Sequence, residues 1–169
     1  MLIEKHCADS IGRLALTFTA EDAPAYADQQ LRDMTAAPHL KALIVVLSDI
    51  PDGGPFSERI TSIRTCLATV LIPTAAVLSE TASKAAKEIA DACLFQYTGP
   101  EDALAAAVAS AEAALTALTA RRPRRVITAV MQSLHNAETL PIEDALLQET
   151  QLFCELSRQN QQREEEETP

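Results

Sequence analysis

Glycine is scarce in this sequence. The 169 residues include four glycines, whereas an average usage of about 7% would give roughly 12. The chain accordingly lacks G-x-G-x-x-G and G-x-x-x-x-G-K-[ST], whose glycines let the backbone cradle phosphate groups, and it lacks the G-x-S-x-G turn of serine hydrolases. These absences argue against the common nucleotide-binding and serine-hydrolase sites.

Basic residues are also few. There are 14 Lys and Arg against 24 Asp and Glu, which gives a formal charge of -10. Binding to nucleic acid depends on clustered cations that neutralise phosphates, so we expect no nucleic-acid partner. Part of the acidic excess is the run Glu164–Glu167, which predicts a solvated tail.

Several other signals are missing. The four cysteines, Cys7, Cys66, Cys93 and Cys154, form no C-x-x-C motif. We therefore expect them to be reduced and to serve as small apolar side chains. His6, His39 and His135 are far apart in the sequence, and no metal-ligand spacing stands out. No signal-peptide pattern opens the chain, and no apolar run approaches the ~18 residues of a membrane span. We therefore expect a cytoplasmic protein with no metal and no membrane partner.

What the chain does contain is alternating strand and helix patterns. Leu43–Leu47 and Thr74–Leu78 are continuous apolar runs, typical of parallel strands that are buried on both faces. We expect two further strands at Leu14–Thr19 and Cys93–Phe95, with helices between the strands. The predicted class is α/β with parallel strands.

The last third of the sequence is predicted to be helical. We expect three parts: an α/β core over residues 1–99, helices over 100–157 that pack on the core or on a neighbouring subunit, and a polar acidic tail over 158–169 that is disordered.

Three segments resemble the crotonase family, the enoyl-CoA hydratases and isomerases. The segment Pro73–Tyr97 aligns without a gap on the family pattern P-x-x-A-x-x-N-G-x-x-x-G-G-G-x-E-x-x-x-x-C-D. Leu43–Phe56 is similar to the strand that leads into the family's A-F-x-A-G-x-D loop, and Leu140–Phe153 looks like its late helix. The resemblance implies a shortened crotonase-like (ClpP/crotonase-type) ββα spiral core.

The resemblance also implies a site. In the family, two backbone N–H groups form an oxyanion hole that holds the thioester oxygen of an acyl-CoA. Carried onto this sequence, the two donors fall at Glu58 and Ala85, and a catalytic glutamate falls at Glu88. The family's glycines are replaced here by Glu80, Lys84, Ala85 and Ala86, which predicts an eroded oxyanion hole.

Glu88 has two readings. It is either a general acid or base, or one half of a surface ion pair with Lys84, four residues earlier in the same helix. The segment that would carry the family's second catalytic glutamate is missing, because Tyr97 leads almost directly into the next helix. Hydration of a double bond is therefore less expected than simple polarisation of a thioester.

Two further features keep alternatives open. Arg121, Arg122, Arg124 and Arg125 either hold the phosphates of a CoA-like ligand, form a basic helix end, or dock the acidic tail of a neighbouring chain. Glu149 lies within an apolar helical stripe, so it either has a partner, such as one of these arginines, or sits at the edge of the stripe.

Three functions follow from these observations. The first is acyl-CoA-related binding or a non-catalytic companion subunit, with no other cofactor. The second is an active small acyl-CoA isomerase or hydratase that uses Glu88. The third is a homo-oligomeric interaction module without a ligand. The resemblance implies oligomers, usually trimers or their multiples, or a complex with a related subunit.

Overall fold

The computed structural model describes residues 6–8, 10–18, 25–52 and 54–167, which form two compact units. The first unit ends at Arg121 and the second begins at Arg122. The helix that follows residue 100 belongs to the first unit and packs on its sheet. The division expected at residue 99 stays a prediction.

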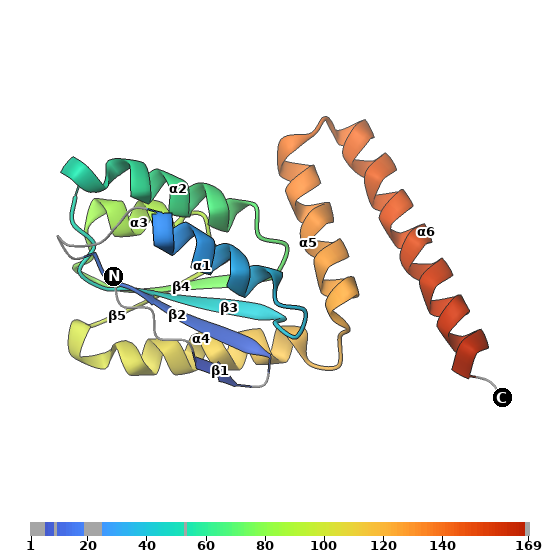
Figure 1. Cartoon of the computed structure of the whole chain (residues 1–169), viewed down its shortest axis with the longest axis horizontal. Coiled ribbons are helices and arrows are strands. Elements are labelled where there is room, and N and C mark those ends of the chain that lie inside the picture. The colour runs from blue at the N-terminus through green and yellow to red at the C-terminus, as the bar shows by residue number, and fades with distance from the viewer. Residues whose placement is uncertain (1–5, 9, 19–24, 53, 168–169) are drawn as a thin grey trace. The chain divides into compact units, whose positions relative to one another are not determined.

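The first unit is built on a five-stranded sheet whose strands lie in chain order (Figure 1). Strand β1 (His6–Ala8) is antiparallel to β2 (Ile11–Leu16). Strands β2, β3 (Ala42–Leu47), β4 (Thr74–Ser79) and β5 (Phe95–Gly99) are parallel, which confirms the predicted fold class.

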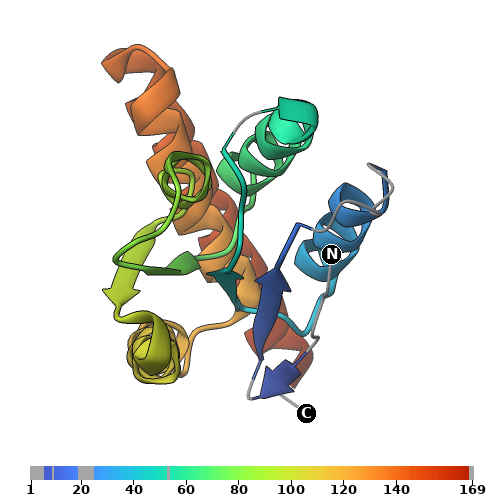
Figure 2. The same ribbon diagram turned by 90° about the vertical axis from the view of Figure 1, so that its left-hand side faces the viewer.

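Helices cover both faces of the sheet. The crossover helices α1 (Ala25–Ala36), α2 (Ser57–Ala68) and α3 (Lys84–Ala90) lie on one face, and α4 (Leu104–Thr119) lies on the other (Figure 2). A one-turn 3₁₀ helix precedes α2 at Gly54–Phe56, and another precedes α4 at Glu101–Ala103.

Alternate residues of the buried strands pack into two different hydrophobic cores, one on each face of the sheet. Leu43, Val45 and Leu47 of β3 pack in the core under the crossover helices, with Ile63 and Ile89. Ala42 and Ile44 of the same strand pack in the core under α4, with Ala111 and Leu115. Because both faces of β3 and β4 are covered, their sequences are continuous apolar runs.

Two strands begin at other residues than the sequence predicted. The first was expected at Leu14–Thr19, but β2 begins earlier, at Ile11. The last was expected at Cys93–Phe95, but β5 begins at Phe95 and pairs Tyr97 with Val77. Cys93 and Leu94 instead lie in the turn after α3, where the Leu94 N–H donates to the Thr74 hydroxyl at 3.2 Å. The Cys93 N–H donates to the carbonyl of Ala90, so both N–H groups have partners outside the strand ladder.

The second unit is a helical hairpin of α5 (Arg124–Thr139) and α6 (Ile142–Glu167). Residues 158–169 were expected to be disordered, but α6 continues as far as Glu167. The residues that extend it are mostly Gln, Arg and Glu, which are good helix formers.

Helix α4, with the 3₁₀ turn before it, gives the one stretch of described helix that is long and apolar enough to cross a membrane, Glu101–Thr119, with a mean hydropathy of 1.3. Core helices meet the same criterion, and one side of α4 packs on the sheet. The stretch is therefore weak evidence for a membrane span.

Candidate functional site

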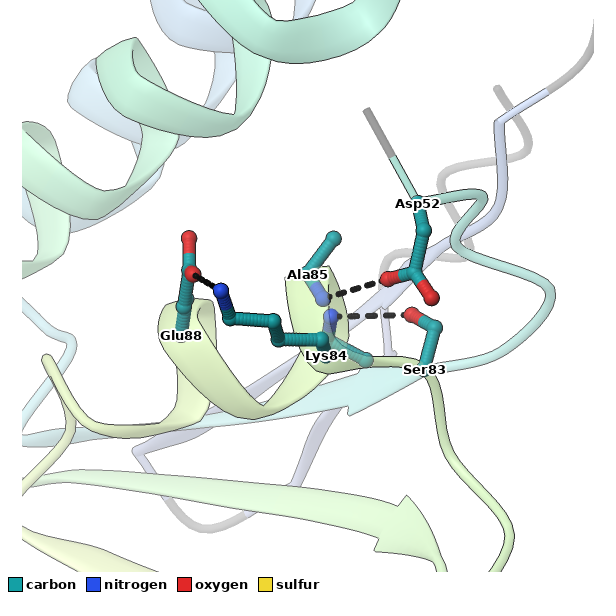
Figure 3. Close-up of polar contacts among 6 residues, drawn as sticks. Asp52, Ser83, Lys84, Ala85 and Glu88 are labelled. Carbon is teal, nitrogen blue, oxygen red and sulfur yellow. Dashed lines mark hydrogen bonds and ion pairs between the residues drawn. The ribbon is translucent and has the colours of Figure 1, made fainter. Parts of the chain in front are cut away.

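The first turn of α3 holds Ala85, one of the two predicted oxyanion donors. Ser83 caps this helix, since its hydroxyl accepts a hydrogen bond from the Ala86 N–H at 3.1 Å. The Ala85 N–H donates to Oδ1 of Asp52 at 2.9 Å (Figure 3). Asp52 lies in the loop after β3, 33 residues away in sequence. Its carboxylate therefore accepts the hydrogen bond that the family resemblance assigned to a thioester oxygen.

Glu58, the other predicted donor position, lies in the first turn of α2. Its side chain is exposed, and Phe56, which precedes the helix, provides no side-chain cap. Glu58 and Ala85 thus belong to the first turns of two different crossover helices. Their pairing in an oxyanion hole stays a prediction.

Glu88 lies on the outer side of α3. Its Oε1 is 3.7 Å from Nζ of Lys84, and its side chain is 41% exposed (Figure 3). The predicted i,i+4 ion pair is thus present in the structure. An exposed pair of this kind contributes about 0.3–0.5 kcal/mol. A catalytic role for Glu88 stays a prediction.

A cleft of about 320 Å³ lies next to the capped end of α3, at the carboxyl ends of the parallel strands. Ligands of open α/β sheets bind at this edge. Ser48 and Asp49 directly follow β3. Ser79 is the last residue of β4, and Glu101 is the second residue after β5. The strands thus bring four polar residues, far apart in the sequence, to one hollow.

Hydrogen bonds connect the residues at the ends of β4 and β5 that lie at this cleft. The Ser79 hydroxyl is 2.9 Å from the Thr81 hydroxyl and accepts the Thr81 N–H at 3.2 Å. The Glu80 N–H donates to the carbonyl of Gly99, which joins the end of β4 to the end of β5. Asp49 has a left-handed backbone, with φ of 52°, which Asp adopts more readily than most residues.

Comparisons with known proteins give a clear answer for the fold. No family model matches the chain, and no curated protein matches it. Among solved structures, an enoyl-CoA hydratase/isomerase family protein from Silicibacter pomeroyi is similar with a TM-score of 0.69 and 17% identity, over 91% of this chain and 99% of the other.

Two more solved structures agree. Pseudomonas aeruginosa DspI has a TM-score of 0.70 at 13% identity, over 91% of this chain and 94% of its own. A putative enoyl-CoA hydratase from Streptomyces coelicolor A3(2) has a TM-score of 0.67 at 11% identity, over 91% and 86%. This chain has the crotonase fold. The resemblance read from the three sequence segments is thereby confirmed at the level of the fold.

The four arginines sit around the end of one helix and the start of the next. Arg121 and Arg122 follow the carboxyl end of α4, where cations are favoured by the helix dipole, whereas Arg124 and Arg125 are in the first turn of α5, where they are not. Nη2 of Arg125 donates to Oδ1 of Asn160 on α6 at 2.6 Å. Binding of phosphate by these residues stays a prediction.

Glu149 has a hydrogen-bond partner on the other helix of the hairpin. The Ser133 hydroxyl on α5 donates to Oε1 of Glu149 at 3.1 Å, and Nδ2 of Asn136 donates to Oε1 of Gln148 at 3.3 Å. Polar contacts therefore join the two helices of the hairpin, so Glu149 is paired within its apolar stripe.

The described cysteines and histidines form no further site. Among the described residues, Cys66, Cys93 and Cys154 are not in disulfide bonds. Burial raises the pKa of Cys93 to about 11, against a smaller opposing effect of its hydrogen bond with Thr74. Among the residues that the structure describes, no group of three or more His, Cys, Asp or Glu side chains could hold a metal ion.

Asp52 and the acidic side chains of the cleft were missed by sequence reasoning. The run Asp49-Ile50-Pro51-Asp52 indicates a loop, but nothing in it indicates that one of its carboxylates reaches the first turn of α3. The position after a parallel strand was the available signal for Asp49, because such positions gather at the ligand-binding edge of a sheet.

Proposed function

We propose that this protein is a non-catalytic crotonase-fold subunit, which binds a partner or ligand and does not turn over enoyl-CoA thioesters. The observation that carries the proposal is the hydrogen bond from the Ala85 N–H to Asp52 at 2.9 Å. An oxyanion hole works through donors that are free and preset where negative charge develops. Here the donor is engaged, and its partner is a carboxylate that would repel an enolate oxygen.

The position of Glu88 supports the same proposal. A general acid or base must lie within hydrogen-bond reach of the proton that it transfers, beside its substrate. The side chain of Glu88 is instead 41% exposed on the outer side of α3 and lies next to Lys84, an arrangement typical of a helix surface.

A companion subunit needs a contact surface, and the helical hairpin offers one. Its helices meet through polar pairs such as Ser133 with Glu149, while large apolar side chains stay exposed. These side chains are Val130, Leu134, Ile142, Leu146, Leu147 and Phe153. We propose that they contact a second copy of the chain, because apolar area of this kind favours association when it is buried.

The second candidate function is an active isomerase or hydratase in which Asp52 moves away when substrate binds. It is favoured by one observation, which is that Asp52 is exposed and lies on a loop. In that case the Ala85 N–H would polarise the thioester and Glu88 would move the proton.

Turnover of crotonyl-CoA distinguishes the non-catalytic subunit from the active isomerase or hydratase. We expect no turnover by the wild-type protein under conditions where a crotonase-fold hydratase reacts, and no heat of binding when crotonyl-CoA is titrated against it by calorimetry. Asp52→Ala frees the Ala85 N–H, and Asp52→Asn is the matched control that keeps an acceptor oxygen. Turnover by the wild-type chain that Glu88→Gln abolishes would overturn the proposal and support the enzyme.

A further inference from the structure

The cleft at the carboxyl edge of the sheet carries an inference that goes beyond the proposed function. Its volume of about 320 Å³ is at the lower end of the range for small-molecule sites. It is formed entirely within the first unit, by the ends of β3 and β4, the first residues of α3 and the turn before α4. The cleft adjoins the first turn of α3 through Ser83 and Ala86, and Ala85, whose N–H donates to Asp52, is not among its described lining residues.

The charge of the lining selects the ligand. Two lining residues, Asp49 and Glu101, carry carboxylates, and they come from two different loops. None of the described residues that line the cleft is Lys, Arg or His. An anionic ligand would therefore meet two like charges and no counter-charge, whereas a cation would be attracted to both carboxylates.

The remaining lining suits the body of a small organic molecule. Leu47, Ile50 and Leu104 supply apolar wall, and the first two are buried in the core under the crossover helices. Ser48 and Thr81 add hydroxyl groups, which accept hydrogen bonds from an ammonium group as well as donate them. Polar side chains outnumber apolar ones in the described lining, which suits a ligand with charged ends and a short apolar middle.

We propose that this cleft binds a small organic cation, a short carbon chain that bears protonated primary amines. The amines contact Asp49 and Glu101, and the chain lies along Leu47, Ile50 and Leu104. The overall charge of -10 adds a long-range attraction for such a ligand.

The test uses three probes with the same four-carbon length: diaminobutane, butanediol and succinate. Each is titrated into the isotope-labelled full chain, and amide resonances are followed by NMR. We expect diaminobutane to shift the resonances of residues 48–50 and 79–83, with an affinity that falls as salt is added. We expect butanediol to bind about tenfold more weakly and succinate not to bind.

Two variants remove the charges with little change of shape. Asp49→Asn keeps a residue that tolerates a left-handed backbone, and Glu101→Gln keeps the side-chain length. Each should weaken diaminobutane binding by about two- to fivefold. Glu138→Gln, an exposed carboxylate on α5 that does not line the cleft, is the matched control and should leave binding unchanged.

Two results would overturn the inference. One is binding of succinate or butanediol as tight as that of diaminobutane. The other is a set of diaminobutane shifts spread over the acidic surface and unaffected by Asp49→Asn and Glu101→Gln, which indicates non-specific counter-ion binding. Neither result bears on crotonyl-CoA turnover, so failure of this inference and failure of the proposed function are distinguishable.

Discussion

Oδ1 of Asp52 lies 2.9 Å from the backbone nitrogen of Ala85 and accepts its hydrogen bond. The contact ties the loop after β3 to the first turn of α3, where a negative charge is also favoured by the helix dipole. The contact therefore stabilises this turn and also engages the Ala85 N–H, which would otherwise be available to a ligand oxygen.

Replacing Asp52 tests that contribution. We expect Asp52→Ala to lower the free energy of unfolding by about 1 kcal/mol, because the Ala85 N–H loses its acceptor and water replaces it. Asp52→Asn should retain most of the stability, since its amide oxygen can accept the same bond. Urea denaturation measures both. Equal losses in the two variants would show that the negative charge, and not the hydrogen bond, is what stabilises the turn.

Gly12 should not accept a side chain. A Cβ atom built on Gly12 would lie 2.9 Å from Cδ1 of Leu40 and 3.2 Å from Cε of Met34. We expect Gly12→Ala to destabilise the protein by about 1–3 kcal/mol, as overpacked cores do. Gly99→Ala is the control, because its Cβ would meet Ala107 at an ordinary 3.6 Å. Thermal unfolding compares the two, and a Gly12→Ala protein as stable as Gly99→Ala would contradict the prediction.

Cys93 should make stability fall at alkaline pH. Burial raises its pKa from 9.0 to about 11, so in the unfolded chain the thiol ionises first. Stability from the neutral thiol is fully present below pH 9 and is lost as the pH rises toward 11. The loss is on the order of 2 kcal/mol.

The measurement is urea denaturation between neutral and alkaline pH, with Cys93→Ala as the comparison. The variant should show a shallower decline over this range than the wild type. Labelling with a thiol reagent gives a second readout: at neutral pH the exposed Cys154 should react well before Cys93. Equal rates for these two thiols would contradict the partial burial of Cys93.

The hairpin surface should determine the oligomeric state. Leu146 is 56% exposed on α6, so Leu146→Glu should dissociate an oligomer without unfolding the chain. Thr150→Glu, one turn further along the same helix and already polar, is the control. Light scattering gives the mass and circular dichroism the helix content. A wild-type protein that is a monomer at high concentration would remove the proposed contact between copies.

The sequence predicted the buried strands well and the edges of the sheet poorly. β3 and β4 are apolar on both faces, so their residues signal them directly. β1 has three residues, too few to show a pattern. β5 is mostly exposed, and its pairing with β4, rather than its own apolar content, determines where it begins.

Much of the candidate site could not be read from the sequence. The ion pair of Lys84 with Glu88 follows from helical spacing, and it was predicted. The contact of Asp52 with Ala85 joins residues 33 positions apart and depends on a loop conformation, which no local pattern specifies. Asp49 and Glu101 come together through the parallel arrangement of β3, β4 and β5, so they can be paired only once the topology is known.

The order of the strands has a consequence for how the chain is made. Because β1 to β5 lie side by side in chain order, each strand leaving the ribosome finds its neighbour already synthesised and adds to the open edge. No strand has to insert between two others. Pairings between consecutive elements close short loops, so the sheet of the first unit can assemble vectorially, from its amino-terminal edge to β5, before the hairpin has been translated.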